Sequence, residues 1–384
     1  MTLSNDQQML VQATREFVAK EIQPFAGAWE REAGGAPQSL LNNLGELGYY
    51  GLLVPPEFGG AGVNITTYAH IIEELAAGDC GLCNLIAVNN SPVALAIRDH
   101  GSEQQRQHYL RALAEGNQRA CFMLTESEAG SDAAAIRTSA RRVTSGYALN
   151  GAKRFVTAGD SADFGLVVAR TDARDDGQGI SCFLVPRERY SVTRLEDKLG
   201  HRNCDTAEVV FDDVLVDDSD RLGGEGDGYR IALAYLNTGR IGVGAQAVGV
   251  ARAALQAANA YARERQTFGR PIADHQAISF RLADMATQLT AARQLVLHAA
   301  ALADAGDNAI AAASMAKLFA TEMADAVCSA AIQIHGGYGY LKDYPVEKYA
   351  RDARVLSIYE GTNDIQRIVV SRQLAAGAIP LGEF

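Results

Sequence analysis

The stretch TAEVVFDDVLVDD, residues 206–218, decides the fold class of this chain. Apolar and polar residues alternate along it, and it is rich in valine. Successive side chains on a β-strand point to opposite faces, so this alternation predicts a strand with one buried face. Residues 141–159, 162–171 and 179–195 have the same character, with glycine and aspartate between them. We therefore predict a compact antiparallel β-domain.

The sequence on both sides of this β-region has the period of an α-helix. Residues 6–30 and 66–79 carry apolar side chains at spacings of three and four, which is typical of amphipathic helices. Residues 229–265 are long, alanine-rich and 3.6-periodic, and residues 274–306 and 311–337 continue the pattern. Three long, mostly apolar helices bury their faces on one another, so we predict a helical bundle.

These changes of period divide the chain into three domains and assign it to the α+β class. We predict an N-terminal α-helical domain over residues 1–118, a middle β-domain over 119–225 and a C-terminal helical bundle over 226–384. Helix faces that the bundle leaves uncovered would pack on other subunits, so an oligomer is expected. GVGAQA, residues 242–247, matches a dinucleotide-binding pattern, but no strand precedes it. Close helix packing explains it better.

The bulk composition excludes several classes of partner. The formal net charge is -11, and the absence of a basic surplus argues against nucleic acid and against anionic membranes as partners. We expect no transmembrane helix, since no segment reaches 18 uninterrupted apolar residues. The histidines show no metal-ligand spacing, and six scattered cysteines fit reduced thiols in a cytoplasm. We expect no secretory signal and no Arg-rich transit peptide at the N-terminus, which favours a bacterial cytoplasm, although a mature mitochondrial form stays open.

A carboxylate stands in an unusual setting in VLSIYEGTNDIQR, residues 355–367. Glu360 follows a mostly apolar turn and precedes Gly361 and Thr362. An acid that faces a pocket there would have a raised pKa, in the range useful for moving protons. Alternatively, Glu360 caps the next helix, since residues 362–364 resemble a turn that opens one. The stretch alone leaves both interpretations open.

Three other stretches suggest ligand contacts. LTESEAGSD, residues 124–132, combines hydroxyls and acids with a flexible turn that can aim backbone N–H groups at a polar ring edge. RERQTFGRPIADHQ, residues 263–276, groups arginines at a helix end, which suits a diphosphate or simply the helix dipole. In residues 332–354, adjacent glycines would let a ligand approach the backbone, although an ordinary interhelical loop is the alternative.

Taken together, eight stretches in order along the chain resemble the flavin-dependent acyl-CoA dehydrogenases, and the short-chain members in particular. The matching stretches are CFMLTESEAGSD, KRFVTAG, DTAEVVFDDVLV, GRIGVGAQAVG, RERQTFG, HQAISFRLADMA, IQIHGGYGY and IYEGTNDIQR. The resemblance implies an N-terminal helical domain, a central β-domain and a C-terminal four-helix bundle. It also implies an FAD-dependent oxidation of an acyl-CoA thioester to a trans-2-enoyl-CoA.

The resemblance also assigns a role to Glu360. In most of the family, the glutamate of the Tyr-Glu-Gly-Thr segment removes the proton α to the thioester, while the β-hydrogen leaves as hydride to the flavin. Such a base needs a raised pKa and a desolvated site. The family's donors to the developing enolate oxygen are the backbone N–H of the base and a flavin hydroxyl. In the branch similar to isovaleryl-CoA dehydrogenase the base stands at the position of Gly239, which cannot serve.

The resemblance implies contacts with FAD, with the acyl-CoA substrate and with other proteins. The expected FAD contacts are Phe122, Leu124, Thr125, Gly130, Ser131, Phe155, Val156, Thr157, Arg265, Phe268, Gln276, Gln333, Ile334, Gly336, Gly337, Thr362 and Asp364. Of these, Arg265, Gln276 and the residues from Gln333 to Gly337 would reach the FAD of a neighbouring subunit. The expected substrate contacts are Ser131, Asn237, Arg240, Tyr359 and Gly361. A homotetramer, built as a dimer of dimers, and an electron-transferring flavoprotein complete the implied partners.

Three positions depart from the family pattern. Phe155 stands where tryptophan is common, and Asn237 stands where aspartate is usual, which removes a charge near the CoA. His335 replaces a usually apolar residue. Three other functions stay open: an acyl-CoA oxidase, an enoyl-CoA reductase on the same fold, and a non-catalytic acyl-CoA-binding homologue. Short or short-branched acyl groups are favoured, but the sequence does not fix the chain length.

Overall fold

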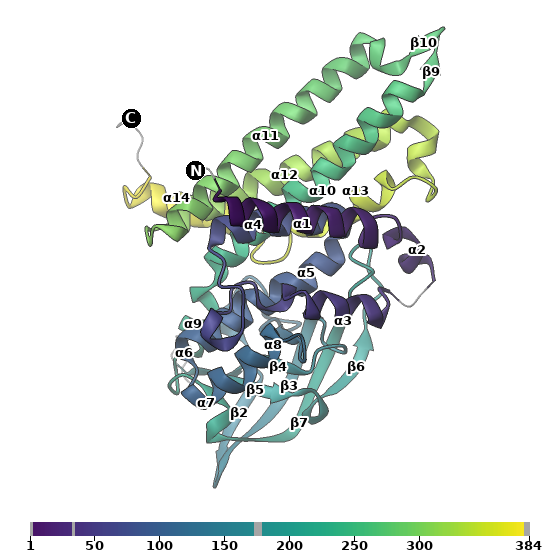
Figure 1. Cartoon of the computed structure of the whole chain (residues 1–384). Coiled ribbons are helices and arrows are strands. Elements are labelled where there is room, and N and C mark those ends of the chain that lie inside the picture. The colour runs from purple at the N-terminus through teal and green to yellow at the C-terminus, as the bar shows by residue number, and fades with distance from the viewer. Residues whose placement is uncertain (1–2, 33–34, 173–178, 380–384) are drawn as a thin grey trace.

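The computed structural model describes residues 3–32, 35–172 and 179–379. A β-sheet region lies at one end of the molecule and long helices extend at the other, with the first helices of the chain beside both (Figure 1). This is the predicted α+β arrangement of helices, sheet and helices.

The N-terminal region is helical, as predicted. Its α-helices are α1 (Asn5–Phe17), α2 (Ala26–Arg31), α3 (Gln38–Glu46), α4 (Ile65–Gly78), α5 (Cys80–Val88), α6 (Leu95–His100), α7 (Glu103–Gln105) and α8 (Arg111–Ala114). Helix α7 begins with a capping box, in which the side chains of Ser102 and Gln105 each accept the other's backbone N–H. Residues Cys80–His100 are long and apolar enough to cross a membrane, but 94% of their most apolar window is buried inside the protein.

The middle region is one sheet of eight strands within the described residues. These are β1 (Ala120–Met123), β2 (Ser139–Val143), β3 (Gly146–Thr157), β4 (Phe164–Arg170), β5 (Ile180–Pro186), β6 (Ser191–Leu195), β7 (Thr206–Asp217) and β8 (Arg221–Leu222). The order is β6-β7-β3-β2-β4-β5-β8, with β1 on β4. Most pairs are antiparallel, but β1 and β2 both pair parallel with β4. The expectation of a purely antiparallel domain is wrong there, because β1 and β2 each reach β4 through a crossover connection rather than a hairpin.

The C-terminal region is the predicted bundle. It comprises α9 (Gly228–Ala234), α10 (Leu236–Glu264), α11 (Gln276–Asp304), α12 (Ile310–His335), α13 (Val346–Leu356) and α14 (Asn363–Ala375), and a short hairpin of β9 (Gln266–Thr267) and β10 (Arg270–Pro271) joins α10 to α11. A Cβ at Gly244 of α10 would lie 2.8 Å from Val296 of α11. A Cβ at Gly249 would lie 2.3 Å from the carbonyl oxygen of Glu73 on α4. The small residues of GVGAQA and its surroundings therefore serve close helix packing, as predicted.

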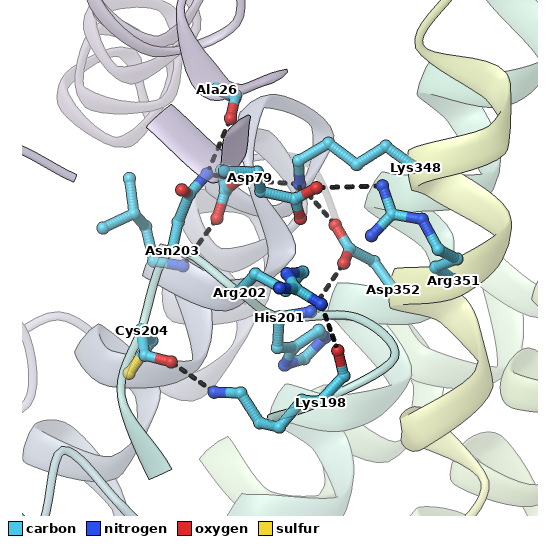
Figure 2. A network of polar contacts seen from close by, with 12 residues as sticks. Ala26, Asp79, Lys198, His201, Arg202, Asn203, Cys204, Lys348, Arg351 and Asp352 are labelled. Atoms are coloured by element: carbon cyan, nitrogen blue, oxygen red, sulfur yellow. Dashed lines mark hydrogen bonds and ion pairs between the residues drawn. The ribbon is translucent and has the colours of Figure 1, made fainter. Parts of the chain in front are cut away.

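A buried polar network connects α13 to the other two regions (Figure 2). The ammonium of Lys348 lies 2.8 Å from Asp79 Oδ2, between α4 and α5, and 2.5 Å from Asp352 Oδ2. Asn203 Nδ2 donates to Asp79 at 2.7 Å, and the backbone N–H of His201 donates to Asp352 at 2.7 Å. His201 and Asn203 belong to the loop between β6 and β7. The network thus fixes the helix that leads into the Glu360 turn.

Candidate active site

A pocket with a volume of ≈ 710 Å³ lies where the three regions meet. The β-region, α10 and the segment that follows α13 all contribute to its wall. Twelve of the residues predicted as site residues line it: Phe122, Leu124, Thr125, Gly130, Ser131, Phe155, Thr157, Asn237, Arg240, Tyr359, Glu360 and Gly361. Residues far apart in the sequence therefore meet at one cavity.

Glu360 lies on a tight turn between α13 and α14. Its φ is 54°, in the left-handed region that is uncommon for a residue with a side chain, and the φ of Gly361 is 86°. The N-cap of α14 is Thr362, whose hydroxyl accepts the backbone N–H of Ile365 at 3.3 Å. The alternative in which Glu360 caps α14 is therefore wrong, since a neighbouring residue has that role and Glu360 lines the pocket.

The surroundings of Glu360 favour its neutral form. Burial raises the pKa of Glu360 to about 7, although the positive charges of Arg240 and Lys317 oppose the shift. A carboxyl group with a pKa near the operating pH is suited to accept a proton from a weak carbon acid. The direction of this pKa shift agrees with the expectation that the carboxyl group of Glu360 resists ionisation.

Asn237 and Arg240 lie one turn apart on α10. Arg240 Nη1 donates to Asn237 Oδ1 at 3.1 Å and to Ser314 Oγ at 3.4 Å. The guanidinium is buried, and its Nε has no hydrogen-bond partner among the described residues. A neutral amide at position 237 thus orients Arg240 without neutralising its charge.

The β-region contributes a wall that fits a flat, polar-edged ring. The ring of Phe155 is 61% exposed, and the guanidinium of Arg154 lies 5.4 Å from its centroid. Thr157 accepts a hydrogen bond from Asn84 Nδ2 at 3.2 Å. Behind this wall, the buried Lys153 donates to the carbonyl oxygen of Leu124 at 3.0 Å. An exposed aromatic ring beside side-chain hydroxyls provides stacking and hydrogen bonding, so these residues fit an isoalloxazine ring.

A second pocket, of ≈ 550 Å³, lies at the far end of α10. Arg265, Ile334, Gly336 and Gly337 line it, as do residues of an aromatic cluster around His335. A Cβ at Gly336 or Gly337 would meet nothing within 4 Å, so a ligand can approach both backbones. The exposed glycine backbone beside an arginine fits a diphosphate. Arg240, near the start of α10, and Arg265, the C-cap of the same helix, are 25 residues apart, or about 37 Å at 1.5 Å per residue.

The ring of His335 has a packing role that the sequence did not suggest. It stacks on Tyr261, with the ring centroids 4.3 Å apart, and its Nδ1 lies 2.8 Å from the carbonyl oxygen of Ala331. Burial lowers the pKa of His335, which favours the neutral ring. An uncharged imidazole can therefore replace an apolar side chain here.

Six predicted contacts line neither pocket within this chain. The side chain of Val156 is buried in the core, and the hydroxyl of Thr362 is used by the helix cap. The other four side chains are exposed: Phe268, Gln276, Gln333 and Asp364. Phe268, in the hairpin between α10 and α11, is 96% exposed. Their contacts with FAD stay predictions.

Sequence reasoning missed three buried polar residues behind the Glu360 turn. Gln246 accepts a hydrogen bond from the hydroxyl of Tyr359. Gln366 donates to the carbonyl oxygens of Glu360 and Gly361. Lys317 donates to Gly361 as well. All three lie on helices that appear apolar or amphipathic, so only their polarity at core-facing positions could have revealed them.

Models of the three acyl-CoA dehydrogenase domains match the chain. The N-terminal domain matches residues 4–117, the middle domain residues 121–214 and the C-terminal domain residues 226–375. An acyl-CoA dehydrogenase of Bacillus subtilis is 44% identical over 98% of this chain and 100% of that protein. A short-chain specific acyl-CoA dehydrogenase of Clostridium acetobutylicum is 39% identical over 97% and 98%. A caffeyl-CoA reductase-Etf complex subunit of Acetobacterium woodii is 39% identical over 97% and 99%.

Solved structures give the same result. Butyryl-CoA dehydrogenase from Megasphaera elsdenii superposes with a TM-score of 0.95, at 38% identity over 98% of this chain and 99% of that chain. A chain in a structure described as an electron transferring flavoprotein of Acidaminococcus fermentans superposes equally well, at 42% identity over 97% and 99%. The chain therefore belongs to the acyl-CoA dehydrogenase family of oxidoreductases, and short-chain specific enzymes are among its relatives.

Proposed function

We propose that this protein oxidises a short acyl-CoA to the trans-2-enoyl-CoA, with Glu360 as the base that removes the α-proton. The observation that carries the proposal is the position of Glu360. Its carboxyl group lines the ≈ 710 Å³ pocket, and burial raises its pKa to about 7. The relatives named for short-chain acyl-CoA and butyryl-CoA support the substrate class.

The residues around Glu360 prepare the proton transfer. The α-proton of a thioester is weakly acidic, and a desolvated carboxylate is a stronger base than one in water. We assign the backbone N–H of Glu360 as a donor to the thioester oxygen, where negative charge develops. Arg240 and Asn237 would orient the CoA part of the substrate. The positive charge of Arg240 also keeps part of the Glu360 population ionised near neutral pH.

FAD, when bound, supplies the acceptor for the hydride that leaves the β-carbon. Phe155 and Thr157 would hold the ring system against the β-region, together with Thr125 and Ser131. The phenyl ring of Phe155 keeps an aromatic surface where the family often has tryptophan. These four side chains would fix the reacting face of the ring toward Glu360.

Arg265, Gly336 and Gly337 would hold the FAD of a second copy of the chain. About 37 Å separates Arg265 from Arg240, which lines the pocket of Glu360, so the FAD held at Arg265 would be a different copy from the one that reacts in that pocket. A closed assembly of this kind is a homotetramer built as a dimer of dimers. We further propose a cytoplasmic enzyme that passes electrons to an electron-transferring flavoprotein, as the names of two relatives suggest.

A hydrogen-bonded pair beside the pocket, Tyr359 and Gln246, favours a short acyl group. Tyr359 lines the pocket, and its hydroxyl donates to the fully buried Gln246 of α10. This hydrogen-bonded pair occupies the space between α10 and the Glu360 turn. A longer acyl chain would have to displace it and leave polar groups unpaired, which is costly in a buried site.

A second candidate is the reverse reaction, the reduction of an enoyl-CoA. Two relatives at 39% identity are named as reductases, a 3-(aryl)acrylate reductase of Clostridium sporogenes and the caffeyl-CoA reductase subunit. The same base and the same pocket would serve both directions. The direction is therefore a matter of the electron donor and acceptor.

An anaerobic visible spectrum of the purified protein tests the proposal. Butyryl-CoA, isobutyryl-CoA, isovaleryl-CoA and octanoyl-CoA are titrated in turn. We expect butyryl-CoA or a short branched thioester to bleach the oxidised flavin band. The reductase would be favoured by a bound flavin that none of these thioesters bleaches. Once reduced chemically, such a flavin would be reoxidised when crotonyl-CoA is added. Protein that holds no flavin after FAD is added back would contradict the proposal.

A further inference from the structure

A fully buried lysine lies beneath the Glu360 turn. Lys317 of α12 has no exposed surface, and its Nζ donates to the carbonyl oxygen of Gly361 at 3.0 Å and to Asn363 Oδ1 at 2.9 Å. Asn363 in turn donates from Nδ2 to Thr321 Oγ1, one turn along α12, at 3.0 Å. A buried ammonium without a full charge partner is expensive, so a lysine kept at this place calls for an explanation beyond packing.

The turn that Lys317 contacts is conformationally strained. Glu360 and Gly361 are consecutive residues with φ of 54° and 86°. A residue with a Cβ loses stability in the left-handed region, and it stays there only if its surroundings determine its conformation. Two side-chain donors, from Gln366 and Lys317, hold the carbonyl oxygens of this turn. Gln366 Nε2 lies 2.8 Å from the carbonyl oxygen of Gly361 and 3.3 Å from that of Glu360, and Lys317 contacts Gly361 from α12.

We propose that Lys317 is a positioning residue for the base: its ammonium holds the Gly361 carbonyl and the Asn363 side chain, and thereby fixes the direction and the ionisation of the Glu360 carboxyl group. The proposal rests on the proposed function and deepens it. Lys317 is not among the residues that line the ≈ 710 Å³ pocket. It acts through the turn that carries Glu360.

The charges around Lys317 and Glu360 determine in which direction Lys317 shifts the pKa of Glu360. Lys317 faces Glu360, Arg240 and Glu322, and Glu360 faces Lys317 and Arg240 beside the hydroxyls of Tyr68 and Tyr359. Burial lowers the pKa of Lys317 to about 7, and the negative charge of Glu360 opposes this. The positive charge of Lys317 in turn lowers the pKa of Glu360. Loss of that charge raises the pKa of Glu360, so less of the active base is present at neutral pH.

Two variants separate position from charge. Lys317→Met removes the donor and the charge in a side chain of similar length. Gln366→Leu removes the other donor to the same turn but no charge. We would measure anaerobic flavin reduction by butyryl-CoA in a stopped-flow instrument between pH 5.5 and pH 9, and hydrogen exchange of residues 357–366 in the FAD-loaded protein. Lys342→Met, at an exposed position in the loop between α12 and α13, is the matched control.

In Lys317→Met and in Gln366→Leu, the amide hydrogens of the Glu360 turn should exchange at least about tenfold faster than in the parent. Only Lys317→Met should also move the midpoint of the pH–rate curve, by about one unit to higher pH. Lys317→Arg, which keeps the charge, should return the midpoint to the parent value, and Lys317→Gln, which removes the charge but stays polar, replaces Lys317→Met if the latter does not fold. An unchanged midpoint of the pH–rate curve in Lys317→Met would overturn the proposal. A midpoint in folded Lys317→Arg that moves as far as the one in Lys317→Met would overturn it too.

The outcome for the parent protein separates this inference from the proposed function. If butyryl-CoA and the other thioesters do not reduce the parent flavin, the proposed function fails. Hydrogen exchange of the turn then still decides whether Lys317 positions it, because that readout does not need turnover. Unchanged exchange in both variants would contradict the positioning role whatever the reaction is.

Discussion

The carboxyl group of Glu360, on the turn after α13, lies directly against Gly239 of α10. A Cβ at position 239 would lie 2.8 Å from Glu360 Oε2 and 3.1 Å from its Cδ. The carboxyl group thus occupies the space that a side chain at position 239 would take. A base at position 239, as in the branch similar to isovaleryl-CoA dehydrogenase, and the carboxyl group of Glu360 would need the same space. The two arrangements therefore exclude each other, and this chain has a glycine at 239 and its carboxyl group at 360.

A methyl group at position 239 should therefore disturb the base without removing it. In Gly239→Ala the Glu360 carboxyl group must move by several tenths of an ångström, and proton transfer depends steeply on such a displacement. We expect flavin reduction by butyryl-CoA to slow by about 10- to 100-fold while FAD stays bound. Gly27→Ala in α2 is the control, since its Cβ would meet only Arg31 Nη1 at 3.4 Å. Equal rates in both variants would show that the carboxyl group has freedom to move.

The rate of flavin reduction should rise with pH through about 7. Glu360 acts as a base only when it is ionised, and burial raises its pKa to about 7, so the active fraction grows as the pH increases through that value. Glu360→Gln should lower the rate by about 10²–10⁴-fold or more and remove this pH limb. Stopped-flow reduction at constant ionic strength checks both. A rate in Glu360→Gln close to that of the parent would exclude Glu360 as the base.

His201 should make the protein less stable in mild acid. Burial lowers the pKa of His201 to about 4, although Asp352 opposes the shift. The unfolded chain takes up this proton below pH ~6.5, whereas the folded chain does not until about 4, so the stabilising contribution is present above pH ~6.5 and is lost between these values. The loss amounts to about 3 kcal/mol at most.

His201→Asn tests this contribution, because asparagine tolerates the left-handed φ of 53° at this position. We expect the variant to lose less of its apparent free energy of unfolding than the parent between pH 7 and pH 5, by about 2 kcal/mol. Denaturant unfolding at fixed protein and FAD concentrations measures it. His298→Asn, on the exposed face of α11, should behave as the parent. The same pH dependence in His201→Asn as in the parent would rule out His201 as its source.

Removal of Lys348 should destabilise the whole assembly of helices and sheet. Its ammonium lies close to Asp79 and Asp352, which are both buried. Lys348→Met leaves two carboxylates without their cation, and loss of one partner of a buried ion pair costs about 3–5 kcal/mol. We expect the apparent free energy of unfolding to fall by this amount. Lys342→Met, at an exposed position, should leave it unchanged, and an equally stable Lys348→Met would contradict a stabilising role for the network.

The pair of Tyr359 and Gln246 should limit the length of the acyl chain. Gln246→Ala removes the buried partner of the Tyr359 hydroxyl and frees space behind Tyr359, which lines the pocket. We expect the ratio of kcat/KM for octanoyl-CoA to that for butyryl-CoA to rise by about tenfold or more, since each methylene accommodated contributes about 1–3 kcal/mol. A ratio that does not change would move the limit to another wall of the pocket.

The sequence predicted the architecture well, because long segments with a clear period determine it. The alternation in residues 206–218 belongs to β7, and the 3.6-periodic stretch over residues 229–265 belongs to α9 and α10. The parallel pairing of β1 with β4 was not predictable, since it depends on a crossover connection and not on local alternation. The role of Lys317 was not visible either. In the sequence it is one polar residue in an apolar helix, and only the fold brings it under Gly361.

The length of α10 has a consequence for how the protein keeps its cofactor. Under the proposed function, each copy of the chain would supply the Glu360 pocket to one FAD and Arg265, about 37 Å from Arg240, to the FAD of another copy. Under the proposed assembly, retention of FAD is then governed by mass action among subunits. Dilution would release flavin along with the partner, and excess FAD would draw separated chains back together. Ligand and quaternary structure would thus be linked through the span of a single helix.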